Sequence, residues 1–214
     1  MVQCVHSIHC AAQTMTNPIE KQDLFVEQTF LKLDLPEQHF SGKEFDGCTF
    51  DSCHFSDTIF EQCKFYECKF MNCNLSLISV QGSSFFDTTF EECKIVGVNW
   101  TRATWPRIKL NSPLHFVKCI LNNSSFFGLG LKEISMIECK VKEVDFRESD
   151  CTEANFSYSD FEGSLFNKTN LTKADFREAI NYQIDIFFND IKKAKFTLPE
   201  AMRLLAGLDI ELTD

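Results

Sequence analysis

The stretch EANFSYSDFEGSLFNKTNLTKADF, residues 153–176, decides the fold. A bulky apolar residue returns at every fifth position, and a small residue stands two positions before each of them. An amphipathic helix needs apolar spacings of three and four, and a half-buried strand needs a spacing of two. A spacing of five fits neither, so the structural unit must itself be five residues long. The central residues of this stretch are Phe156, Phe161, Phe166, Leu171 and Phe176.

The same period covers most of the chain. Central residues fall on multiples of five from Phe25 to Phe90, the register slips by one within residues 111–115, and the series resumes at Phe116. Most of the 23 phenylalanines belong to this series. Inward residues two positions apart are what a short extended segment offers to an interior, because alternate side chains share a face. A chain that turns after every five residues winds around an axis, which predicts a solenoid.

Charge and composition disfavour two classes of partner before any motif is considered. The 214 residues carry a formal net charge of −10, which disfavours nucleic-acid binding through a basic surface and docking on anionic membranes. No apolar run approaches the roughly 18 residues of a membrane-spanning helix, and the first residues do not resemble a signal peptide. We therefore expect a cytoplasmic protein with no direct nucleic-acid or membrane partner.

The 11 cysteines follow the repeat. Eight occupy the small inward position and Cys151 a central one, so we expect buried structural thiols rather than disulfides or metal ligands. Cys4, His6, His9 and Cys10 lie outside the repeats, in residues 1–16. Such residues can bind zinc, but their spacing is tighter than in standard structural sites. We expect residues 1–16 to be a disordered extension, and no metal site.

The repeat resembles the pentapeptide-repeat family, whose consensus is A(D/N)LXX. The Asp or Asn before the central residue appears here as Asn155, Asp160, Asn170 and Asp175. The resemblance implies an all-β protein, a right-handed quadrilateral β-helix with four pentads per coil, over residues 17–196. Coils separated by ~4.8 Å would then number roughly seven to eight. We expect a local distortion around Trp100, Trp105, Pro106 and Pro113.

The period changes after Phe196. Thr197 and Glu200 fit a capping box, so residues 197–214 are expected to form a short helix followed by a short strand. This segment resembles the C-terminal dimerisation module of the Qnr and MfpA proteins, which implies a homodimer; a simple cap of a monomer is the alternative. The candidate interface residues are Leu198, Ala201, Met202, Leu205, Leu208, Ile210 and Leu212.

Carboxylates recur at the second position after the central residue, which should face outward. After correction for the slip, two acidic faces are expected. One is formed by Glu27, Glu67, Asp87 and Glu148, and the other by Glu37, Asp57, Glu138 and Glu178. Ordinary solvation explains scattered acids. The alternative is that an acidic rod presents a regular negative field to a basic protein groove.

The resemblance supplies a specific function. Qnr-like proteins imitate duplex DNA, bind DNA gyrase and topoisomerase IV, and protect them from quinolones or peptide toxins. The Qnr proteins of Gram-negative bacteria carry two projecting loops, whereas a single-residue slip near Pro113 suggests a loop-less member. No residues form an enzyme motif, so we expect no catalytic residues, no cofactor and no small-molecule substrate. The alternative function is a structural protein-protein interaction module with an unknown partner.

Overall fold

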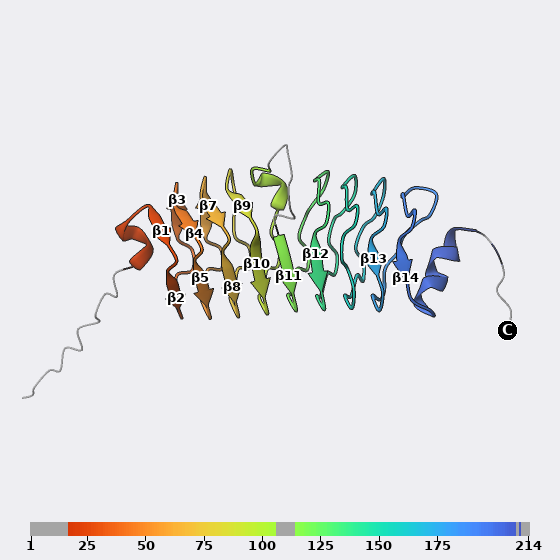
Figure 1. Cartoon of the computed structure of the whole chain (residues 1–214), viewed down its shortest axis with the longest axis horizontal. Coiled ribbons are helices and arrows are strands. Elements are labelled where there is room, and N and C mark those ends of the chain that lie inside the picture. The colour runs from red at the N-terminus through yellow and green to blue at the C-terminus, as the bar shows by residue number, and fades with distance from the viewer. Residues whose placement is uncertain (1–16, 106–113, 209, 211–214) are drawn as a thin grey trace, which may run out of the picture.

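The computed structural model describes residues 17–105, 114–208 and 210. They form a rod, a parallel β-solenoid of about eight turns, with short 3₁₀ helices near both ends (Figure 1). This confirms the expected all-β quadrilateral β-helix. None of the described helices is long and apolar enough to cross a membrane. The expected disorder of residues 1–16, and the Cys4–Cys10 cluster within them, lie outside the described residues.

All of the strand pairs are parallel, and paired residues lie 20 positions apart except between β10 and β11. One sheet contains β1 (Leu24–Val26), β4 (Glu44–Asp46), β7 (Lys64–Tyr66) and β9 (Ser84–Phe86). The second contains β2 (Thr29–Leu31), β5 (Thr49–Asp51), β8 (Lys69–Met71), β10 (Thr88–Glu91), β11 (Leu114–Val117) and β12 (Ser135–Ile137). Two-stranded pairs join β3 (His39–Ser41) to β6 (Ile59–Glu61) and β13 (Asp175–Phe176) to β14 (Lys195–Phe196).

The central residues fill the interior as stacked ladders of rings. Phe30, Phe50, Phe70 and Phe90 stack nearly parallel, with successive ring centroids 4.5–5.0 Å apart. Stacked aromatic rings bury large apolar areas, so the ladders are the main source of stability. The spacing of five residues is thereby explained: each of four faces contributes one central residue, most often a ring, per coil.

Almost all described corners of the rod use a residue in the left-handed conformation. Positive φ angles occur at 24 non-glycine residues, and all but Asn181 stand at the second position after a central residue. Ten of them are Glu, with φ between 49° and 62°. This conformation costs an L-residue about 1–2 kcal/mol, so the corners are held by the ladders on either side of them. The same geometry points these carboxylates outward.

The small inward position has a hydrogen-bonding role besides its size. The Cys53 N–H donates to Sγ of Cys73 at 3.4 Å, and Sγ of Cys73 donates to the Phe50 carbonyl at 3.4 Å. The Cys73 thiol thus links two main-chain groups of adjacent coils, the Cys53 N–H and the Phe50 carbonyl, that do not meet directly. The described cysteines are free thiols, and Cys53, Cys73, Cys93, Cys119 and Cys139 share one column.

The break in the period is larger than the expected slip of one residue. Phe90 pairs with Phe116, so the spacing of stacked residues rises from 20 to 26 across this coil. Before the break, the Thr104 N–H still donates to the Ser83 carbonyl in the ordinary register. Six additional residues therefore lie between Thr104 and Leu114, most of them outside the described residues. A 3₁₀ helix η2 (Trp100–Arg102) precedes the insertion, as expected of a local distortion.

Both ends of the rod carry 3₁₀ helices. At the N-terminal end, Asn17 accepts a hydrogen bond from the Ile19 N–H and caps η1 (Pro18–Lys21). At the C-terminal end, η3 spans Glu200–Leu208. The expected strand after this helix falls largely outside the described residues, apart from Leu208, which belongs to η3, and Ile210.

The expected capping box at η3 does not form. The Thr197 hydroxyl accepts from the Glu178 N–H at 3.1 Å, and Glu200 Oε1 accepts from the Asn181 N–H at 2.6 Å. Both donors belong to the last coil, whose outer edge would otherwise have unpaired N–H groups. The two side chains predicted to cap the helix therefore cap the β-helix.

Candidate interaction surface

The corner residues line up in four rows along the rod, and the insertion changes which carboxylates share a row. Because the offset across the break is 26 rather than 21, one row contains five acidic side chains. We call this row the acidic edge, and its carboxylates are Glu27, Glu67, Asp87, Glu133 and Glu153.

The predicted grouping of acidic faces was wrong for the coils after the break. Glu148 lies on the row of Arg102 and Lys168, away from the acidic edge. Glu138 and Glu178 lie on the row of Glu92. Glu37 and Asp57 share a row, and it continues to Glu143. Each error follows from reading a six-residue insertion as a single extra residue.

The carboxylates of the acidic edge differ in their partners. Asp87 lies 3.4 Å from His115, Glu133 lies 3.6 Å from Lys132, and Glu153 lies 2.6 Å from Lys173. The hydrogen bond from Lys173 and its charge hold the pKa of Glu153 below its usual value. Glu27 and Glu67 form no ion pair with a described residue and are exposed. The negative field of the edge is therefore least neutralised in its first coils.

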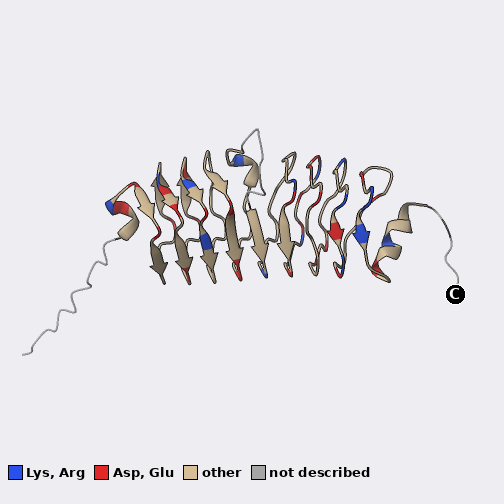
Figure 2. Ribbon diagram, viewed as in Figure 1, with Lys and Arg blue, Asp and Glu red and all other residues tan. Residues whose placement is uncertain are grey.

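Charge is distributed unevenly along the rod. The described residues up to 162 contain 23 Asp and Glu against 12 Lys and Arg, whereas residues 163–208 contain five against seven. Figure 2 shows Lys and Arg among the last coils and on η3. On the acidic edge itself, the sign reverses at Lys173 and Lys193. An acidic surface for a basic partner is thus a property of the body of the rod.

The described thiols of the coils are enclosed by the core. Burial raises the pKa of the Cys68 thiol to about 12, so this side chain stays protonated at neutral pH. Within residues 17–105 and 114–208, no three His, Cys, Asp or Glu side chains are grouped to hold a metal ion. An open cleft of about 440 Å³ lies between the last coil and η3, lined by Tyr182, Asp185, Arg203 and neighbouring residues.

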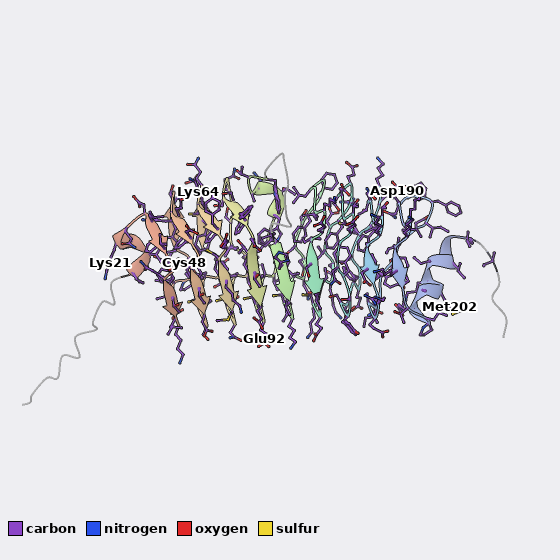
Figure 3. The ribbon with its side chains drawn as sticks, viewed as in Figure 1. Lys21, Cys48, Lys64, Glu92, Asp190 and Met202 are labelled. Atoms are coloured by element: carbon purple, nitrogen blue, oxygen red, sulfur yellow. The ribbon has the colours of Figure 1, made fainter. Side chains whose placement is uncertain are left out.

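The predicted dimer residues of the C-terminal module are exposed to different degrees. Leu198, Met202 and Ile210 are 75%, 48% and 53% exposed. Ala201, Leu205 and Leu208 are half-buried, and Leu212 lies outside the described residues. Figure 3 places Met202 on η3 at the C-terminal end. Phe187 and Phe188 are also exposed at this end, and the sequence analysis did not predict them as surface residues. The loss of the five-residue period around them was the signal that could have identified them.

The repeat and the coil geometry agree with a sequence comparison. The family described as "Pentapeptide repeat region" matches residues 43–114 and 99–176, well over half of the chain. The chain belongs to the pentapeptide-repeat family. A search of curated protein sequences finds no match to this pentapeptide-repeat protein.

One solved structure shares the fold of this pentapeptide-repeat protein, and two others are similar at lower TM-scores. A trypsin-treated form of QnrB1, a plasmid-mediated fluoroquinolone resistance protein, is 20% identical with a TM-score of 0.56, covering 89% of this chain and 97% of its own. Full-length QnrB1 is 21% identical (TM-score 0.45; 85% and 100% covered). HetL, involved in heterocyst differentiation regulation in the cyanobacterium Nostoc, is 13% identical (TM-score 0.43; 82% and 87%). At these identities the likeness concerns the fold alone.

Proposed function

We propose that this protein imitates duplex DNA, binds a type II topoisomerase such as DNA gyrase or topoisomerase IV, and protects it from quinolones or topoisomerase-targeting toxins. The observation that carries the proposal is the acidic edge. Five carboxylates follow one corner of a straight rod, on a body in which acids outnumber bases by 23 to 12. A regular line of negative charge suits a protein groove that normally holds a phosphate backbone. The QnrB1-like fold supports the same reading.

The proposal includes a homodimer formed through the C-terminal module. Leu198, Met202 and Ile210 expose large apolar surfaces at one end of the rod. Apolar side chains gathered at an end favour burial against a second copy. Two rods joined there would carry one acidic body on each side of the junction. Light scattering tests this step: a dimer is expected for the full chain, and a monomer for Met202→Glu.

The experiment for the function is a gyrase supercoiling assay with ciprofloxacin, with and without the protein. We expect the protein to restore supercoiling in the presence of the drug, and direct binding that weakens steeply as salt is raised. Absence of inhibition, rescue and binding at micromolar protein would reject the proposal.

A matched pair of variants locates the partner surface. Glu27→Lys with Glu67→Lys reverses the two carboxylates of the acidic edge that have no described ion-pair partner. Glu37→Lys with Asp57→Lys makes the same charge change on another corner. We expect the first pair to lose more binding than the second. Equal losses would mean that net charge, and not this edge, determines binding.

A further inference from the structure

The first sheet of the rod carries a strip of outward apolar side chains, interrupted by Asp46, beside the acidic edge. The outward residues at the ends of β1, β4, β7 and β9 are Val26, Asp46, Tyr66 and Phe86, which pair in register. Val26 is 51% and Phe86 40% exposed, and the Tyr66 and Phe86 rings lie 6.3 Å apart, tilted by 50°. We call the Tyr66 and Phe86 rings, together with the aliphatic Val26 two strands away, the aromatic patch. Removing an aromatic ring from water is favourable, so two neighbouring rings on a surface favour an intermolecular contact.

Carboxylates border the aromatic patch. Glu27, Glu67 and Asp87 directly follow Val26, Tyr66 and Phe86 in the chain, and Asp46 lies within the strip. Among the described residues, Glu27, Asp46 and Glu67 form no ion pair. An apolar partner would remove these carboxylates from water without compensating them, which is unfavourable.

Two described lysines on nearby strands, Lys64 and Lys69, are already paired. Lys64 lies 3.2 Å from Glu44, and Lys69 lies 3.0 Å from Glu91. His115 faces Asp87. Among the described residues, these lysines therefore leave Glu27, Asp46 and Glu67 available to an incoming cation. A partner that satisfies both features of the surface must bring positive charge together with a flat group that stacks on rings.

We propose that the aromatic patch and its carboxylates bind arginine side chains of a basic protein segment. The guanidinium group stacks on aromatic faces and pairs with carboxylates through its planar donors, and it is more weakly hydrated than an ammonium group. The contact adds specificity to the acidic edge, since charge alone does not distinguish Arg from Lys. This inference rests on the proposed function for the identity of the partner, and it names the part of the rod that the basic groove contacts.

The test compares two fluorescent peptides, deca-arginine and deca-lysine, by anisotropy with the full chain. We expect tighter binding of deca-arginine. Phe86→Ala should weaken deca-arginine binding about fivefold, consistent with a loss near 1 kcal/mol, and leave deca-lysine binding nearly unchanged. The matched control is Phe127→Ala, because Phe127 is 41% exposed but lies beside Arg147 on a different face. That control should bind both peptides like the wild type.

Two outcomes would overturn the inference: equal affinity of the wild type for the two peptides, or equal effects of Phe86→Ala and Phe127→Ala. Phe86→Leu keeps an apolar side chain but removes the ring, so it separates stacking from folding. It should retain the thermal unfolding temperature and lose the preference for arginine. A variant that keeps the preference also contradicts the inference.

Peptide and enzyme results together distinguish the two proposals. Arginine preference that depends on Phe86, without gyrase binding, leaves the patch standing and rejects the topoisomerase partner. Gyrase binding that is unaffected by Phe86→Ala supports the partner and rejects the patch.

Discussion

The coils before the insertion and the coils after it build the same rod with different corner chemistry. Before it, the small inward residue is mostly Cys, and Figure 1 shows most of the strands, β1 to β10, in this half. After it, Ala and Ser become common, and adjacent coils meet mainly through isolated bridges. A five-residue repeat therefore specifies the path of the chain without specifying how each corner is hydrogen-bonded.

The difference follows from how one backbone N–H at each corner is hydrogen-bonded. The Ala154, Ala174 and Ala179 N–H groups each donate to the carbonyl of the central residue three positions earlier, closing a tight turn. The described Cys corners lack this turn bond; at Cys53 and Cys73 a thiol from the next coil accepts from the N–H, and at Cys63 a serine hydroxyl does. An Ala methyl is enough where the backbone N–H is hydrogen-bonded within its own turn. Where it is not, the small residue of the next coil must supply a polar atom to accept from it.

Removing a ring from a ladder should have the largest effect. Phe50 is buried and stacks between Phe30 and Phe70, at 4.9 and 4.5 Å. Phe50→Ala leaves a cavity and should lower the free energy of unfolding by about 3–5 kcal/mol. Chemical denaturation checks this value. The counterpart after the break is Leu171→Ala, where a smaller aliphatic side chain is lost and the destabilisation should be smaller.

Removing the hydrogen-bonded thiol of Cys73 tests the Cys corner directly. Cys73→Ala should lower the free energy of unfolding by about 1–3 kcal/mol, because the Cys53 N–H and the Phe50 carbonyl lose their partner. Cys73→Ser keeps a donor and acceptor at the same place and should be the milder change. If Cys73→Ala is as stable as Cys73→Ser in denaturation, the thiol acts only by filling space.

The sequence predicted the fold because a spacing of five is incompatible with ordinary helices and strands. It could not reveal the insertion's length: six residues equal one pentad plus one, so Leu110 continues the apolar series in the sequence and the insertion looks like a slip of one residue. The misplacement of Glu148 and Glu138 follows from that ambiguity. Thr197 and Glu200 were misassigned for another reason, since the same side chains can cap a helix or the edge of a sheet.

Acid should loosen the coils after the break more than those before it. Arg177 donates hydrogen bonds to Asp175 and holds the pKa of that carboxyl below its usual value, and Arg147 does the same for Asp145. A lowered folded-state pKa gives stability that is present at neutral pH and lost as pH falls below about 4. Hydrogen exchange at pH 3 and pH 7 should show the larger loss of protection in residues 114–196. Asp175→Asn should remove part of the difference.

Relaxing a corner should have the smallest effect, and it separates backbone strain from surface charge. Glu138 has a φ of 55° and faces outward, so Glu138→Gly removes a strain of about 1–2 kcal/mol. The same change adds freedom to the unfolded chain, which opposes the gain by about 0.5–1 kcal/mol. We expect a thermal unfolding temperature equal to or slightly above that of the wild type. Glu138→Ala keeps the strained φ while removing the charge, and should fall below Glu138→Gly. The reverse order would mean that the carboxylate, and not the backbone, determines which residue the corner accepts.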